Sequence, residues 1–174
     1  MELIDIYDKN RNKTGRTKER FSDPLNDGEY VLVVGALLIN AEAKLLISKR
    51  ADTKLSNPGL WEFVGGGSIS GESSKEAVIR EIKEEIGVDF NTNDGILVKT
   101  AKTDHLIKDL WAFRLNANIK DINYDKKEIS EIKWENIENV IKLREEAKMI
   151  DSNMVTEEDF KWCIKKLYGA KGGI

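Results

Sequence analysis

The sequence predicts an α/β sandwich in which one layer of helix lies on each side of a mixed β-sheet. Apolar runs typical of buried strands fill residues 30–40 and 44–50, and shorter ones recur after residue 95. Amphipathic segments with helix-capping residues stand between these runs and after them. Strands interspersed with helices in this way favour helices packed on both faces of a sheet.

The composition is that of one folded domain. The chain has 174 residues, of which 40% are hydrophobic and 34% charged, enough for a core and against disorder. No apolar run approaches the roughly 18 residues that cross a bilayer, and the start MELIDIYDKN is unlike a secretory signal. We therefore expect a cytoplasmic protein with no membrane partner.

The charge pattern gives no sign of a nucleic-acid duplex as partner. The formal net charge is −3, and lysines and arginines are dispersed rather than gathered into a basic stripe. An anionic substrate would then need local help, such as a metal ion. Cys163 is the one cysteine, so a disulfide framework and a zinc site are not indicated, and a buried helix residue is the favoured interpretation over a reactive thiol.

The first elements are an N-terminal arm and two strands. The stretch ELIDIYD alternates apolar and polar residues before the turn residues DKNRNKTG, which predicts a short hairpin or extended arm within 1–28. The apolar runs 30–40 and 44–50 are separated by a short turn, so we expect paired strands.

A glycine-rich segment then leads to a helix. Residues 55–74 are aperiodic, which predicts a loop with one brief strand at LWEFV. The helix should cover about 74–86, because Ser73 and Glu76 have capping-box spacing and Gly87 suits a left-handed C-cap.

The rest of the chain predicts three strands and two helices. The later strands are expected at 96–103, 105–117 and 128–134. A helix should begin near Asn136, and a final one over 156–168 is marked by capping residues at its start. The tail after residue 168 is expected to fray. We expect a single domain with an arm at 1–28, a core at 29–143 and a C-terminal helix and tail at 144–174.

The first helix carries two faces. At about 100° per residue, one arc is apolar and is expected to pack on the sheet. Three acids, Glu81, Glu84 and Glu85, form a second arc, whereas Arg80 falls elsewhere and is expected to face outward or sideways. The acids either form a solvated helix face or hold a hard divalent cation, which would reverse the repulsion between Glu81 and Glu85 at i,i+4.

The segment around this helix resembles the Nudix family. Gly66, Glu72 and the run REIKEEIGV at 80–88 match the Nudix box G-x5-E-x7-R-E-U-x-E-E-x-G-U, where U is aliphatic, at every fixed position. The resemblance extends over about 29–143. It implies a Nudix-type α/β/α sandwich and Mg²⁺- or Mn²⁺-dependent hydrolysis of a small-molecule diphosphate linked to another group, often a nucleoside diphosphate derivative.

The resemblance also implies roles for the box residues. Glu81, Glu84 and Glu85 would be metal ligands and the Gly66 carbonyl a further one, with Glu81 and Glu84 directly in the chemistry. Arg80 and Glu72 would orient the site by pairing with the acids or with each other; the alternative is a weak surface pair.

The general base is left open by the sequence. It would be a box glutamate or an acid from a later loop, where Glu128 is the favoured catalytic acid or fourth ligand. Glu131 is a weaker candidate, and both are otherwise solvated acids at the end of a strand.

The substrate contacts are less defined. Lys49 and Arg50 end a strand and could hold a phosphate. Trp61 and Phe63, like Trp111, would either stack on a base or belong to the core. His105 is expected in a turn. The basic N-terminal arm covers either the pocket or the partner in a possible homodimer.

Two departures from the family pattern suggest alternatives. Val64 stands where members often have a proline before the paired glycines. The stretch 27–67 also resembles the isopentenyl-diphosphate isomerase-like branch, but Gly65 occupies the place of the cysteine that such isomerases use. A catalytically silent binding domain is the other alternative, and the intact box argues against it.

Overall fold

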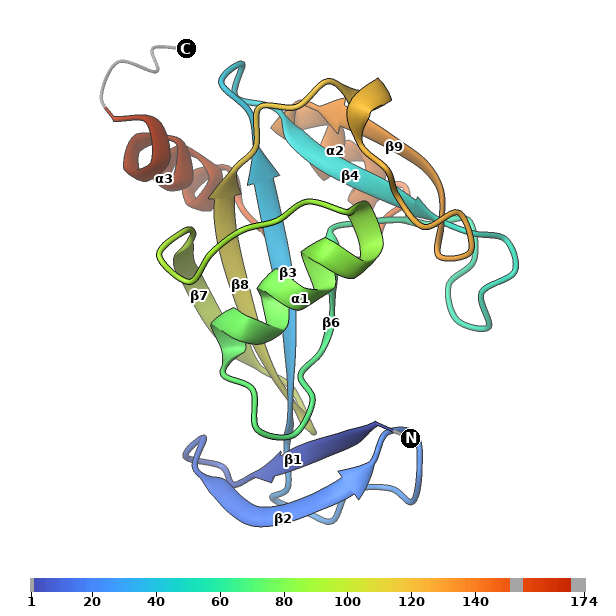
Figure 1. Ribbon diagram of the computed structural model, residues 1–174, viewed down its shortest axis with the longest axis vertical. Coiled ribbons are helices and arrows are strands. Elements are labelled where there is room, and N and C mark those ends of the chain that lie inside the picture. Colours follow the sequence, from blue (N-terminus) through green and yellow to red (C-terminus); the bar gives the residue numbers. More distant parts are fainter. Residues whose placement is uncertain (1, 151–154, 170–174) are drawn as a thin grey trace.

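A computed structural model describes residues 2–150 and 155–169, and in this part of the chain a seven-stranded mixed sheet forms the centre (Figure 1). Its strands are β3 (Val31–Ile39), β4 (Leu45–Arg50), β5 (Trp61–Glu62), β6 (Val64–Gly67), β7 (Ile96–Lys102), β8 (Leu106–Arg114) and β9 (Ile129–Glu135). The expected fraying of the tail falls on 169–174, of which 170–174 lie outside the described residues.

The long strand β3 organises the sheet. It pairs in parallel with β8 along its whole length and antiparallel with β6, and it meets β4 only at the turn, where Ile39 faces Leu45. The strand β4 then diverges from β3 and pairs with β5 and β9. At the other side β7 is the last strand of the path, and its register with β8 shifts between Leu97 and Lys99.

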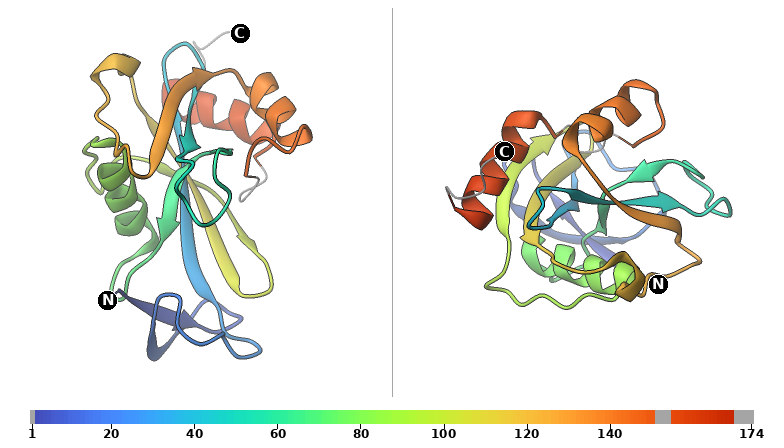
Figure 2. Two further views of the ribbon diagram at one scale, coloured as in Figure 1. Left: turned by 90° about the vertical axis from the view of Figure 1, so that its right-hand side faces the viewer. Right: turned by 90° about the horizontal axis from the view of Figure 1, so that it is seen from above.

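Helices cover both faces of the sheet, as the sequence predicts. The helix α1 (Ser74–Ile86) lies on one face, and α2 (Ile137–Glu145) and α3 (Glu157–Tyr168) lie on the other (Figure 2). The capping box of α1 and its C-cap at Gly87, with φ 70°, are both present. No helix among the described residues is long and apolar enough to cross a membrane.

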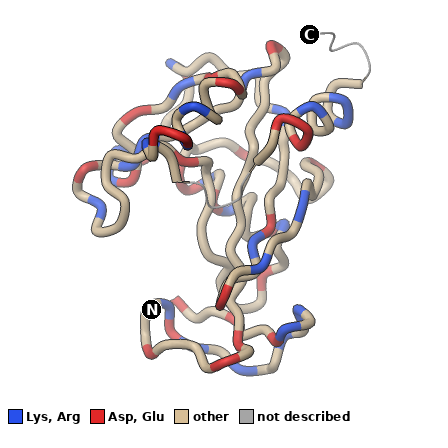
Figure 3. Tube along the Cα trace, turned by 180° about the vertical axis from the view of Figure 1, so that it is seen from behind, with Lys and Arg blue, Asp and Glu red and all other residues tan. Residues whose placement is uncertain are grey.

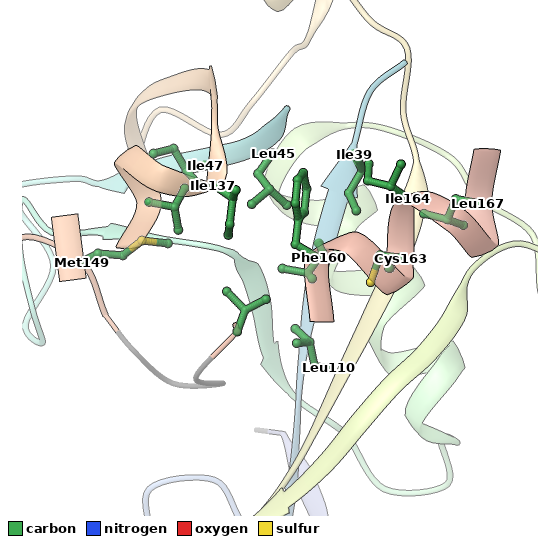
Figure 4. Close-up of a cluster of buried hydrophobic side chains, with 14 of the residues drawn as sticks. Ile39, Leu45, Ile47, Leu110, Ile137, Met149, Phe160, Cys163, Ile164 and Leu167 are labelled. Atoms are coloured by element: carbon green, nitrogen blue, oxygen red, sulfur yellow. The ribbon is translucent and has the colours of Figure 1, made fainter. Parts of the chain in front are cut away.

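The alternation of side chains along β3 divides the core in two. Leu37 and Ile39 pack toward α2 and α3, whereas Ala36 and Leu38 pack toward α1. Figure 4 shows the first of these clusters, in which Cys163 is fully buried. Burial raises the pKa of the Cys163 thiol to about 12, so the prediction of an inert core cysteine is confirmed.

The glycine-rich segment differs from its prediction. Instead of a loop with one brief strand, it forms two strands, β5 on β4 and β6 on β3. Glycine at position 65 permits the close pairing of β6 with β3. A Cβ there would stand 2.2 Å from the Val34 carbonyl oxygen, which is too close for any side chain. A short 3₁₀ helix, Ile119–Asp121, also went unpredicted.

The N-terminal arm is a hairpin of β1 (Leu3–Tyr7) and β2 (Lys13–Glu19), one of the two forms that the sequence allowed. It forms a separate two-stranded sheet below the domain in Figure 1. Tyr7 and Tyr30 exchange backbone hydrogen bonds of 2.8 and 2.9 Å, which join the hairpin to the start of β3.

Two carboxylates anchor this hairpin. Asp109 on β8 is fully buried and pairs with Arg11, which also donates to Thr100 at 3.1 Å. Asp5 on β1 accepts from the Ser70 hydroxyl at 2.8 Å and from the Gly71 amide at 3.0 Å, both in the loop before α1. The hairpin is therefore fixed relative to that helix.

We expect Arg11→Ala to lower the free energy of unfolding by about 2 kcal/mol, because Asp109 would stay buried with only a hydroxyl as partner. Urea denaturation measures the loss. Arg16→Ala is the control, since Arg16 is an exposed residue of the same hairpin and its ion pair with Glu29 should contribute under about 1 kcal/mol. Equal losses in the two variants would contradict the anchoring role of Asp109.

Candidate active site

A cleft of about 1070 Å³ opens beside α1. Its walls come from five segments. They are the acidic side of α1, the strand β6, the loop between β4 and β5, the end of the N-terminal hairpin and the loop before β9. The lining residues are Glu2, Arg20, Phe21, Arg50, Thr53, Lys54, Leu55, Ser56, Gly65, Gly66, Arg80, Glu81, Glu84, Glu85, Asp125 and Glu128.

The three acids of α1 all line this cleft. Their burial differs, because Glu81 is buried at 8% exposure, Glu85 is half-buried and Glu84 is exposed. The apolar arc of the same helix packs on the sheet through Val78, Ile82 and Ile86. The two faces that the sequence predicts are therefore present.

Gly66 makes room for one of these acids. A Cβ at Gly66 would stand 2.6 Å from the carboxyl carbon of Glu81, so any side chain there would displace that carboxylate from its position. The strand β6 thereby brings the backbone of Gly66 directly against an acidic side chain of α1.

The helical wheel predicted that Arg80 faces outward or sideways, but in the structure its side chain points toward the acids of the cleft. Its guanidinium donates to Glu72 at 2.7 Å, to Glu81 at 2.8 Å and to Glu84 at 2.9 Å. It also donates to the Gly67 carbonyl oxygen at 3.0 Å. The long side chain turns back along the helix, which a wheel drawn from Cα positions does not show. Its pairing with Glu72 and the acids is the one that the family resemblance implied.

The local electrostatics raise the pKa values of two acids. Burial raises the pKa of Glu85 well above its usual value, and the nearby charges of Glu62, Glu81 and Glu128 add to this. Burial also raises the pKa of Glu81, while the hydrogen bond from Arg80 opposes the change. Groups with pKa values displaced in this way cluster at functional sites.

The donor set of the site fits a hard divalent cation. Carboxylates and backbone carbonyls are the oxygen ligands that Mg²⁺ prefers, and the crowding of Glu81 and Glu85 would be relieved by positive charge. Within 2–150 and 155–169, however, no three acids, histidines or cysteines stand close enough to hold an ion as they are placed. Glu81 and Glu84 would have to turn from Arg80 toward it.

The acidic residues that follow the first helix in sequence differ in whether they line the cleft. Glu128 lines the cleft and pairs with Lys54, whereas Glu131 on β9 is exposed and outside the lining. Asp125 also lines the cleft, and its amide donates to the Glu85 carbonyl oxygen at 2.9 Å. The structure thus brings Glu128 to the box acids and leaves Glu131 away from them.

Arg50 reaches the cleft and Lys49 does not. Arg50 donates to Glu62 at 2.9 Å, and burial raises the pKa of that carboxyl. Trp61 is buried in the core with Lys133 over its ring at 4.5 Å, and Phe63 packs against the same core cluster. These two aromatics occupy the core, the alternative to base stacking that the sequence left open.

The remaining candidates lie away from the cleft. Trp111 packs against the α1 side of the core and donates to the Ser74 hydroxyl at 2.9 Å. His105 stands in the turn before β8, as predicted, with Nδ1 3.0 Å from the Glu29 carbonyl oxygen. Neither residue lines the site.

Sequence reasoning missed several residues that form this cleft. Asp125 lies in a loop without periodicity and carries no motif of its own. Arg20, Phe21 and Leu55 reach the cleft only through tertiary packing. A local pattern carries no signal for such contacts.

Comparison with known proteins agrees with this geometry. The family model of the NUDIX domain matches residues 29–157. The chain belongs to the Nudix family. The matched region extends beyond the predicted end of the core at 143 and leaves the N-terminal hairpin outside.

Relatives and solved structures extend the match. A Listeria monocytogenes protein named as an uncharacterized Nudix hydrolase is 28% identical over 86% of this chain and 89% of its own length. An RNA pyrophosphohydrolase from Rickettsia prowazekii is 28% identical over 63% of this chain and 77% of its own. The crystal structure of DR0079 from Deinococcus radiodurans superposes with a TM-score of 0.75 at 23% identity, covering 93% of this chain and 99% of that one.

These matches confirm the predicted fold and place the chain among the Nudix hydrolases. They do not support the finer resemblance to isopentenyl-diphosphate isomerases, which stays a prediction.

We expect Gly66→Ala to lower kcat at least tenfold, because the added methyl would displace the Glu81 carboxylate. Steady-state assays on the best substrate of this protein measure the loss, and thermal melting shows whether the fold survives. Gly67→Ala is the comparison, since its Cβ would meet only the flexible end of Arg20 at 3.2 Å. A larger loss in Gly67→Ala would contradict the role of Gly66.

We expect Glu85→Gln to stabilise the metal-free protein at high pH. The raised pKa of Glu85 means that the wild type loses stability as pH rises through that value, whereas glutamine does not titrate. The two proteins should melt together near pH 4. At pH 8 the variant should have the higher Tm by calorimetry. A difference that does not change with pH would contradict this origin.

Proposed function

We propose that this protein is a metal-dependent hydrolase that cleaves the pyrophosphate bond of a diphosphate linked to another group, with a nucleoside diphosphate derivative as the substrate class. One observation carries the proposal. The three box glutamates line a single cleft with Gly66, opposite cationic side chains from another loop. Carboxylates that could bind a cation and positively charged side chains that could bind a phosphate therefore line the same cleft.

The cationic side of the cleft would bind the substrate phosphates. Arg50 and Lys54 come from the end of β4 and the loop after it, and both line the cleft. Arg50 is fixed by Glu62 and by the Ser56 carbonyl oxygen at 3.0 Å, so its guanidinium is oriented before substrate arrives. Lys54 pairs with Glu128 and would exchange that partner for a phosphate oxygen.

The reaction is attack of water on one phosphorus in line with the bridging oxygen, whose bond to that phosphorus breaks. Mg²⁺ or Mn²⁺, when bound by Glu81, Glu84, Glu85 and the Gly66 carbonyl, would lower the pKa of the attacking water and neutralise phosphate charge. Arg80, held by Glu72, pairs with Glu81 and Glu84 before a cation binds, and these two acids would exchange Arg80 for the cation.

A carboxylate of the cleft would take the proton of the attacking water. Glu128 is the favoured base, because it lines the cleft near the box acids and is exposed enough to reach a water. Glu85 is the alternative, since it also lines the cleft and its raised pKa makes it a stronger base than an ordinary glutamate. Glu128→Gln and Glu85→Gln distinguish the two candidates, because loss of the true base should lower kcat more.

The charge distribution supports a small substrate over a duplex. Lysines and arginines alternate with acids along the trace in Figure 3, and the net charge is −3. RNA pyrophosphohydrolases among the relatives make a phosphorylated RNA end a useful member of the substrate panel.

A substrate screen with Mg²⁺ and Mn²⁺ tests the proposal. The panel holds nucleoside diphosphate sugars, dinucleoside polyphosphates, ADP-ribose, NADH, coenzyme A, nucleoside triphosphates, 5′-triphosphorylated RNA and isopentenyl diphosphate. Phosphate release, directly or after phosphatase coupling, reports hydrolysis, and isomer formation reports the isomerase alternative. Binding without turnover across the panel would indicate a silent domain and overturn the proposal.

We expect Glu84→Gln to abolish hydrolysis, with kcat at least about 100-fold lower, because the cation loses a charged ligand. The fold should survive, since Glu84 is exposed and the helix loses no packing. Glu138→Gln on α2 is the control, because Glu138 is an exposed acid outside the lining of the cleft. Full activity of Glu84→Gln, or activity that persists in EDTA, would contradict the metal-dependent mechanism.

A further inference from the structure

Two apolar side chains stand exposed in the lining of the cleft. Phe21 and Leu55 have relative exposures of 93% and 105%, the highest of the large apolar side chains in the described parts of the chain. Single exposed apolar residues are common on protein surfaces. Here both belong to the lining of the site that holds the box glutamates, so a bound ligand would cover them.

The backbone at Phe21 has an unfavourable conformation. Its φ is 67°, in the left-handed region that costs residues other than glycine about 1–2 kcal/mol. No packing of the ring compensates for this, because the side chain is almost fully exposed. Strain of this kind is found where a side chain must be presented to a ligand.

Arg20 fixes the ring from one side. Its guanidinium lies 5.3 Å from the centre of the Phe21 ring and pairs with Glu2 at 2.8 Å. The guanidinium also stands over Gly67, beside the box. Arg20 therefore connects the ring to the part of the cleft where phosphates would lie.

The hairpin that carries Phe21 is firmly placed. The anchors at Asp109 and Asp5 tie it to β8 and to the loop before α1. In Figure 1 the end of β2 lies below the loop between β4 and β5 on the right-hand side of the molecule. These are the segments that contribute Phe21 and Leu55, so the two side chains enter the cleft from different walls.

We propose that Phe21, Arg20 and Leu55 form a subsite for the nucleobase of a nucleoside diphosphate substrate. This inference rests on the proposed function and adds residues outside the family match at 29–157, except Leu55. Phe21 would stack on the base, Leu55 would contact it from the loop after β4, and Arg20 would bind a phosphate oxygen of the same ligand.

The surroundings favour a base over a hydrocarbon chain. Leu55 lies between Lys54 and Ser56, and Thr53 also lines the cleft, so the apolar contacts are isolated among polar groups. Hydroxyl and amino groups can bind a ribose or the edge of a base, whereas an isoprenoid chain needs continuous apolar surface. The cleft of about 1070 Å³ also exceeds the space that a diphosphate alone would fill.

Binding of two matched analogues tests the subsite without catalysis. The analogue α,β-methylene-ADP carries a base, and methylenediphosphonate carries only the two phosphorus groups. Calorimetry with Mg²⁺ should show that Phe21→Asn binds α,β-methylene-ADP about tenfold more weakly and methylenediphosphonate unchanged. Asparagine tolerates the left-handed conformation, so the variant should be as stable as the wild type or more stable. Phe21→Tyr, which keeps an aromatic ring, should retain wild-type affinity for α,β-methylene-ADP.

The exposed Trp162 on α3 provides the control. Trp162→Ala removes another exposed aromatic side chain from a helix that contributes nothing to the cleft and should leave both affinities unchanged. Equal loss of both analogues in Phe21→Asn, or no loss of either, would overturn the subsite.

Kinetics separate the subsite from the proposed function. On the best nucleoside diphosphate substrate, Phe21→Asn should raise KM about tenfold and leave kcat within twofold. Hydrolysis by the wild type with unchanged KM in the variant would refute the subsite alone. If the wild type hydrolyses no member of the panel, the proposed function fails, and the analogue affinities still decide whether Phe21 binds a base.

Discussion

The close approach of β6 to α1 is the constraint on which the site depends. Gly65 fits against the backbone of β3, and Gly66 leaves the space that the Glu81 carboxylate occupies. Side chains at these two positions would push the strand from the sheet or the acid from the cleft. The arrangement places the Glu81 carboxylate close against β6 and near the carboxylates of Glu84 and Glu85. Arg80 compensates part of that charge through Glu81 and Glu84.

Much of this architecture follows from local sequence signals. The helix α1 was predicted with its ends because Ser73 and Gly87 have strong local preferences, and the apolar run of β3 marks a strand buried on both faces. The box acids were found for the same reason, since a helix fixes the relative directions of neighbouring side chains. The assignment of β5 and β6 failed because glycine-rich strands lack the alternation that identifies strands, and their pairing is decided by β3 and β4.

The rest of the site depends on contacts between distant segments. Arg50 meets Glu62 across two paired strands, and Glu128 meets Lys54 across 74 positions of the chain. No periodicity reports such pairs. The direction of the Arg80 side chain was predicted wrongly for a similar reason. The rotamer of a long side chain depends on the partners near it. Position along a chain predicts these partners only when the fold is already known.

The strand β7 ends one side of the sheet, and the register shift between Leu97 and Lys99 has a consequence for the behaviour of the protein in solution. An uninterrupted outer strand offers a row of amide and carbonyl groups to which another chain can add. The extra residue in β7 breaks that row, and Lys99 pairs with Asp159 of α3 beside it. A second strand would therefore find fewer consecutive pairing groups along this edge than along a regular strand.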